Sequence, residues 1–132
     1  MKAHVLIAGE AQGEVLSLSH PISFWGGVDP RTGDIIDARH PERGKNIAGK
    51  ILALPGMIGS SSAAAVMLEL IHAGKAPAAL IMPEPDAILL LGVIVAHEME
   101  WPNCPAFALD KNTQKSLHGK TIRIASDGEI KI

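Results

Sequence analysis

The 132-residue sequence has little cysteine and almost no surplus charge. Its one cysteine, Cys104, excludes an internal disulfide, and one thiolate alone holds neither a zinc ion nor an iron–sulfur cluster. A formal net charge of −2 lacks the basic footprint that nucleic acids and anionic membranes require. We therefore expect no metal bound by this chain, no nucleic-acid partner and no membrane partner.

Aromatic residues are also scarce, with no tyrosine, two tryptophans and two phenylalanines. The core is therefore expected to consist of Ile, Leu, Val, Ala and Met. The longest apolar run, 87–96, is too short to span a bilayer, and no basic and then apolar leader opens the chain. These absences predict a cytoplasmic protein. With 47% hydrophobic and 20% charged residues, the composition predicts a single globular domain over 1–132.

The second half of the chain alternates between strand-like and helix-like patterns. Three serines and a closing Gly74 predict a helix over 60–73, and the apolar run after Asp86 predicts a second, buried helix over 86–98. Strands are expected at 78–82, 105–109 and 121–125, and an Asp127-Gly128 turn leads into 129–132. Such alternation predicts an α/β domain with a partly parallel sheet.

The first half is predicted to be rich in strands. Two short antiparallel strands are expected at 3–8 and 15–18, separated by Gly9 and Gly13, followed by a short strand at 34–37 and a strand at 47–54. Between them, residues 19–33 hold two prolines, three glycines and two serines. A structureless loop of this length is typical of a functional segment.

The segment with most chemical content is 55–62, which reads PGMIGSSS and leads from a strand into a helix. Unpaired N–H groups at a helix start bind carboxylates and phosphates, and they stabilise a serine alkoxide. The structural alternative is a plain serine N-cap, since serine is a preferred residue there. The lysine of a P-loop and the Gly-x-Ser-x-Gly of a nucleophile elbow are both missing.

The loop 19–33 contains adjacent aromatics, Phe24 and Trp25, followed by Gly26 and Gly27. The aromatic pair either covers the core or contacts a partner, and the glycines favour close backbone approach. Asp29 precedes a proline, so it is most simply a turn former, with a place at a subunit interface or active-site mouth as the functional alternative.

Taken together, these motifs resemble the swivel-domain family of aconitase X. The matching residues are ISFWGGVDP at 22–30, Thr32-Gly33, Asp37, His40-Pro41, IAGK at 47–50 and Gly59-Ser60-Ser61. The resemblance implies a swivelling β/β/α domain, here a β-rich first half packed with a strand-helix-strand-helix-strand second half. In that family the domain closes over a site whose iron–sulfur cluster is held by cysteines of a large catalytic part, so a separate large subunit is the expected partner and this chain binds no cofactor.

The resemblance also assigns roles to residues. Ser60 corresponds to the family's catalytic serine, with Gly59, Ser61 and Ser62 beside it for substrate binding. Phe24, Trp25, Gly26, Gly27 and Asp29 form an interface or active-site loop. In the implied mechanism, cluster iron is a Lewis acid for the departing hydroxyl, and the Ser60 alkoxide removes the proton next to the substrate carboxylate.

Known members of this family dehydrate either cis-3-hydroxy-L-proline or 5-phosphomevalonate. They commonly carry a basic residue just before the Gly-Ser, where this chain has Met57 and Ile58. Its absence favours cis-3-hydroxy-L-proline and leaves phosphomevalonate as the alternative, with Lys50 or the large subunit left to supply a cation. Two other functions stay open: a stand-alone module that binds small anions, and a phosphohistidine-type swivelling domain. The latter ranks last because no histidine stands in a helix-start loop.

Overall fold

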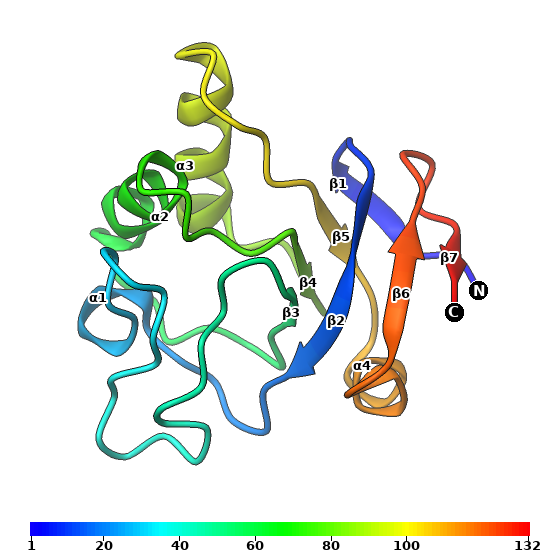
Figure 1. Cartoon of the computed structure of the whole chain (residues 1–132), viewed down its shortest axis with the longest axis horizontal. Helices are drawn as coiled ribbons and strands as arrows, with labels where there is room; N and C mark the ends of the chain where they lie inside the picture. The colour runs from blue at the N-terminus through cyan, green and yellow to red at the C-terminus, as the bar shows by residue number, and fades with distance from the viewer.

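The computed structural model describes all 132 residues as one curled sheet with helices on both faces (Figure 1). The strands are β1 (His4–Ile7), β2 (Ala11–Ser17), β3 (Ile51–Ala53), β4 (Ala79–Met82), β5 (Ala106–Ala108), β6 (Thr121–Ile124) and β7 (Ile130–Lys131). The helices are α1 (Phe24–Gly27), α2 (Ala63–His72), α3 (Ala87–Glu98) and α4 (Lys111–Leu117). This mixed architecture confirms the predicted α/β class.

The sheet has the order β1-β5-β4-β3-β2-β6-β7. The four central strands, β2 to β5, are parallel to one another, and β1, β6 and β7 join antiparallel at the two sides. The first residues of the chain also reach the last strand: the Ala3 N–H donates to the Gly128 carbonyl at 2.9 Å, and the Ile130 N–H donates to the Met1 carbonyl at 2.8 Å. The sheet therefore closes on itself, with both termini at one corner (Figure 1).

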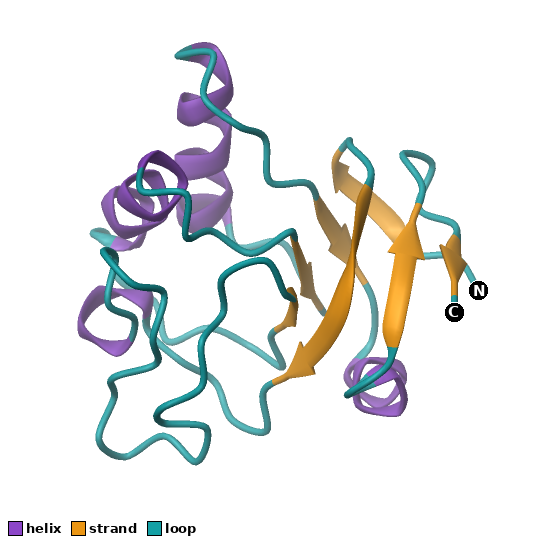
Figure 2. Ribbon diagram, viewed as in Figure 1, coloured by secondary structure: helices purple, strands orange, loops and turns teal.

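Two cores result from side chains that alternate along the central strands. Leu16, Leu52, Leu80 and Met82 point to the larger core under α2 and α3. Their neighbours Val15, Ile51, Ala53, Ala79 and Ile81 fill the second core inside the curl, which Leu117 of α4 also enters. Figure 2 shows the consequence: α1, α2 and α3 lie on one side of the sheet and α4 lies on the other.

The expected antiparallel pairing of the first two strands is wrong. β1 pairs with β5, and β2 lies between β3 and β6. Gly13 was predicted to separate strands but lies within β2. A Cβ there would be 2.8 Å from the Gly49 carbonyl oxygen, so the close approach of the two backbones explains the glycine. The expected strand 34–37 forms only isolated bridges, and 47–54 shortens to β3.

The helix predictions hold in part. α2 begins at Ala63 rather than at residue 60, while α3 begins directly after Asp86, whose carboxylate accepts from the Leu89 N–H at 2.9 Å. The predicted burial of the second helix is wrong for one face, where Ile88, Leu91 and Ile94 are exposed. Helix α4 and the short α1 were not predicted. None of the four helices combines the length and the apolar composition that a membrane span needs.

Candidate active-site edge

The segments with predicted function gather at one edge of the sheet. Because β2, β3, β4 and β5 are parallel, their carboxyl ends meet at this edge. The chain leaves β2 toward the Trp25 segment, β3 toward the Ser60 loop, and β4 and β5 toward the starts of α3 and α4. In α/β proteins with parallel strands, in open sheets and in closed barrels alike, ligands bind outside the carboxyl ends of such strands.

Backbone pairing holds the Trp25 segment against the Ser60 loop. Ile22 forms a parallel bridge with Met57, and the Ile58 N–H donates to the Ile22 carbonyl at 3.2 Å. Two regions separated by more than thirty residues in the sequence thus form one surface.

Ser60 lies at the end of this loop, just before α2, and is half-buried. Its Oγ accepts a hydrogen bond from the Ser62 N–H at 3.2 Å, and its carbonyl accepts from the Ala63 N–H at 3.2 Å. A hydrogen bond donated to a hydroxyl oxygen favours the oxygen's anionic form, and the hydroxyl proton is left free to transfer. The hydroxyl is thus built into the loop as an acceptor, which suits a base.

The residues around Ser60 leave the site open. Ser62 occupies the N-cap position of α2, but its side chain makes no capping bond. The bond from the Ser62 N–H to the Ser60 Oγ is of the kind that a serine cap makes, so the structural alternative also fits Ser60. The N–H groups of Ala64 and Ala65 donate no hydrogen bond. Gly59 and Ser61 are exposed, and a Cβ on Gly59 would meet nothing within 4 Å. Their predicted role in substrate binding remains a prediction.

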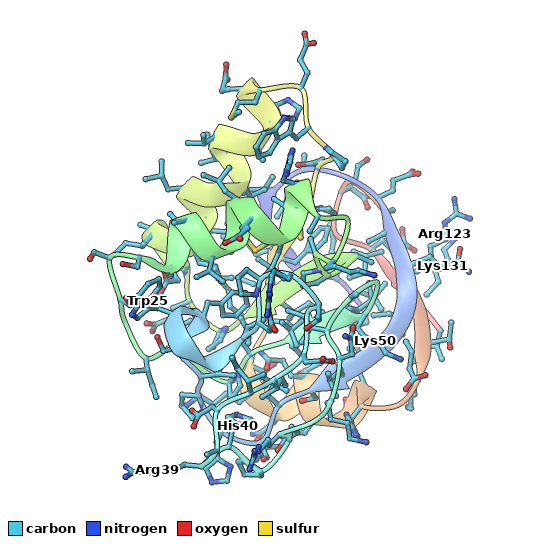
Figure 3. All side chains as sticks on the ribbon, turned by 60° about the vertical axis from the view of Figure 1, so that its left-hand side comes forward. Trp25, Arg39, His40, Lys50, Arg123 and Lys131 are labelled. Atoms are coloured by element: carbon cyan, nitrogen blue, oxygen red, sulfur yellow. The ribbon has the colours of Figure 1, made fainter.

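The Phe24–Gly27 segment separates the two aromatics. Trp25 and Gly26 have the dihedral angles of a type II turn (φ −70°, ψ 113° and φ 78°, ψ −12°), which requires glycine in the second position. Phe24 is fully buried in the core under α2, whereas Trp25 at the corner of the turn is 62% exposed. A Cβ on Gly27 would lie 2.9 Å from Ile22, so close packing explains that glycine. Figure 3 shows Trp25 projecting beside the start of α2.

The whole chain, residues 1–132, matches the model of the aconitase X swivel domain. The chain belongs to this family. A cis-3-hydroxy-L-proline dehydratase of Pseudomonas aeruginosa is 43% identical over 127 residues, which are 96% of this chain and 22% of the relative. This chain therefore spans only about a fifth of that relative's length. A phosphomevalonate dehydratase small subunit of Thermococcus gammatolerans is 37% identical over 134 residues, which are 100% of this chain and 96% of that protein.

A solved structure has the same fold. The crystal structure of aconitase X from Thermococcus kodakaraensis in its holo-form superposes with a TM-score of 0.85 and 36% identity, over 99% of this chain and 95% of the matched chain. The predicted β/β/α swivel fold is thereby confirmed.

In this swivel domain, Asp29 acts locally as a turn former. Its carboxylate accepts from the Arg31 N–H at 2.9 Å, and its carbonyl accepts from the Gly33 N–H at 2.8 Å. The hydrogen bond from the Arg31 N–H holds the pKa of the Asp29 carboxyl below its ordinary value. The alternative role of Asp29 at an interface stays a prediction.

A buried histidine ties down the rest of the long loop. His40 Nε2 donates to the His20 carbonyl at 2.9 Å, while Nδ1 accepts from the Glu42 N–H at 3.1 Å, an assignment that follows from the hydrogen-bond network. The Glu42 carboxylate accepts from the N–H and, at 3.0 Å, from the Oγ of Ser19. His40-Pro41 is part of the family resemblance, but nothing in a His-Pro-Glu-Arg string reveals that the histidine is buried.

The cation missing before Gly59 is not replaced by Lys50. Met57 and Ile58 occupy the positions where the family resemblance implies a basic residue, and Ile58 is 55% exposed. Lys50 lies before β3, at the opposite end of that strand from the Ser60 loop, and its Nζ is 3.6 Å from a carboxylate oxygen of Glu14. It lines a separate cavity of about 800 Å³ between β2, the 42–46 loop and α4. This larger cavity contains no part of the Ser60 loop.

Cys104 does not suit a cluster or metal ligand. Its side chain is buried, its Sγ lies 3.4 Å from the Pro77 carbonyl oxygen, and no three His, Cys, Asp or Glu side chains are grouped to hold a metal. Burial raises the pKa of the Cys104 thiol to about 12.

We therefore expect Cys104 to resist alkylation in the folded protein, because only the thiolate reacts and the buried thiol stays protonated at pH 8. Iodoacetamide followed by mass spectrometry should label it only after guanidinium unfolding. Rapid labelling of the native protein would contradict this prediction.

Proposed function

We propose that this chain is the serine-bearing small subunit of an aconitase X-type hydro-lyase, which removes water from a small hydroxy acid together with a larger chain. The observation that carries the proposal is Ser60, held as a hydrogen-bond acceptor at the ligand-binding edge of the sheet. Ser60 is the base that takes the proton next to the substrate carboxylate. The Ser62 N–H stabilises the Ser60 alkoxide that accepts this proton, and the free N–H groups of Ala64 and Ala65 supply further positive potential.

The site requires a second chain. Nothing in this chain fits an iron–sulfur cluster, and we propose that the cluster expected for the family is held by the large chain. The relative from Pseudomonas, of which this domain matches 22%, has ample remaining length for such a part, and the relative from Thermococcus gammatolerans is named a small subunit.

The proposed docking surface is the apolar rim, defined as Trp25, Ile36 and Ile58. Their exposed fractions are 62%, 47% and 55%. Hydrogen bonds connect the three segments, since the Ile36 N–H donates to the Gly27 carbonyl at 2.9 Å and the Ile58 N–H to the Ile22 carbonyl at 3.2 Å. An apolar rim around a catalytic loop is the arrangement expected where a partner closes the site and excludes water.

Trp25→Ala is expected to weaken association with the large chain by about 30-fold or more, the loss typical of a tryptophan hot spot. The type II turn should persist, because Gly26 supplies the positive φ and Phe24 anchors the segment. Calorimetric titration of the two purified chains measures the change in Kd. Ile132→Ala is the control, since Ile132 is 75% exposed and lies at the terminal corner of the sheet. Equal Kd values for both variants would argue against the rim as the interface.

For the substrate, we propose cis-3-hydroxy-L-proline, with 5-phosphomevalonate as the alternative. The apolar Met57 and Ile58 favour a substrate without a phosphate. Co-expression with the large chain, anaerobic purification and assays with both compounds test the proposal directly. If the two chains never associate, or if the assembled complex dehydrates neither compound, the proposal is wrong. A lone chain that binds carboxylates without a partner would instead support a stand-alone anion-binding module.

A further inference from the structure

A second cavity, of about 370 Å³, opens beside the Ser60 loop at the same edge of the sheet. Its walls come from the carboxyl ends of three neighbouring parallel strands, β3, β4 and β5. The lining residues are Pro55, Gly56, Met57, Met82, Pro83, Glu84, Pro85, Asp86 and Lys111. Its volume lies within the range of small-molecule sites. Since Met57 lines the cavity and Ser60 follows three residues later, their Cα atoms are at most about 11 Å apart.

The cavity carries charges of both signs. Glu84 and Asp86 come from the loop after β4, and Lys111 comes from the start of α4 after β5. Asp86 is partly engaged, because its Oδ1 accepts from the Leu89 N–H at 2.9 Å. Glu84 and Lys111 are both exposed, and neither belongs to an ion pair within the chain. An ammonium-binding group and a carboxylate-binding group thus face one cavity without neutralising each other.

We propose that Glu84 and Lys111 determine substrate specificity by binding the two charged groups of a zwitterionic cyclic amino acid. Glu84 holds the ring ammonium, with the charge of Asp86 behind it, and Lys111 holds the carboxylate. This inference rests on the proposed function. In it, Lys111 from a different loop supplies the cation that is missing before Gly59. A phosphate monoester that also carries a carboxylate suits the cavity poorly, because Glu84 and Asp86 repel both of its anionic groups and only one cation attracts them.

Binding to the assembled complex of both chains tests the inference with two ligands that do not react. L-Proline has the ring ammonium and the carboxylate, and tetrahydrofuran-2-carboxylate has an ether oxygen in place of the ammonium. Calorimetry with the wild-type complex is expected to show a preference for L-proline of about tenfold or more, as charge-assisted hydrogen bonds typically give. Glu84→Gln should reduce this preference to less than about twofold, and Glu84→Asp should keep most of it.

Lys111→Ala should act differently, because the carboxylate is common to both ligands. It is expected to weaken both by about tenfold, leaving their ratio unchanged, while Lys111→Arg should bind both nearly as the wild type does. A matched control pair is Glu129→Gln and Lys131→Ala. Both residues are exposed, Glu129 directly before β7 and Lys131 within it, and Figure 3 shows Lys131 far from Trp25. Neither substitution should change the affinity for either ligand.

Each result decides the inference separately from the proposed function. Equal wild-type affinity for the two ligands, including no binding of either, overturns it, and so does a full preference that survives Glu84→Gln. Loss of the large chain on gel filtration by either variant also overturns it, since the residues then hold the partner. A complex with the predicted preference but no dehydratase activity supports the inference and refutes the function, and an active complex without preference does the reverse.

Discussion

Ser60→Ala in the assembled complex is expected to lower the rate of dehydration by about 10³-fold, within the range for removal of a general base. KM should change little, because the Ser60 alkoxide takes the proton while other groups hold the substrate charges. The free energy of unfolding should fall by less than about 1 kcal/mol, since only the hydrogen bond from the Ser62 N–H is lost. Single-turnover rates over a range of substrate concentrations measure the rate and the substrate dependence, and thermal unfolding of the same preparation measures the change in stability.

The matched control is Ser126→Ala, which removes an exposed hydroxyl from the turn before β7 and should leave the rate unchanged. Ser61→Ala gives a second comparison, because Ser61 is exposed beside the base and is predicted to bind substrate, so KM should rise more than kcat falls. Full activity of the Ser60→Ala complex would remove Ser60 from the mechanism.

Gly128→Ala is expected to destabilise the fold by about 3 to 5 kcal/mol, one of the largest effects that a single methyl group produces. Gly128 has φ 92°, which is unfavourable for alanine, and a Cβ there would lie 2.2 Å from the Ala3 carbonyl oxygen. The backbone must move apart, which breaks the bond from the Ala3 N–H to the Gly128 carbonyl where the sheet closes. Denaturant unfolding measures the loss.

Gly44→Ala separates the two causes. Gly44 has the same φ of 92°, but a Cβ there would meet nothing within 4 Å. Its substitution should therefore cost only the backbone strain, about 1 to 2 kcal/mol. If the two variants lose equal stability, close contact at the sheet closure contributes nothing and the packing argument is wrong.

Much of the back half could be predicted from the sequence because each signal there is local. Asp86 before an apolar run begins a helix, Gly74 ends one with φ 72°, and the Asp127-Gly128 turn leads into β7. The short α4 was missed because KNTQKSL has no apolar stripe of its own. The sequence signal for the start of α4 was its N-cap residue Asp110, whose carboxylate accepts from the Thr113 N–H at 3.1 Å.

Other features depend on distant contacts and could not be read locally. The pairing of β1 with β5 joins residues about a hundred positions apart, so two neighbouring strand patterns were wrongly paired with each other. The exposed stripe on α3 was hidden by an apolar pattern around the whole helix. The Ser60 loop and the Trp25 segment were both recognised, but their contact, and the cavity with Glu84 and Lys111, arise only when parallel strands bring separate loops to one edge.

The closure of the sheet has a consequence for how the domain can be connected. Met1 is hydrogen-bonded to Ile130, so a covalent tether attached at either terminus starts from the same corner. Helices α2 and α3 and the Ser60 loop lie away from that corner (Figure 1). Fusion through either end, or circular permutation with a short linker between the ends, should therefore present the serine in the same way. Such freedom of connection agrees with the sequence matches to a fifth of a long dehydratase and to nearly the whole of a small subunit.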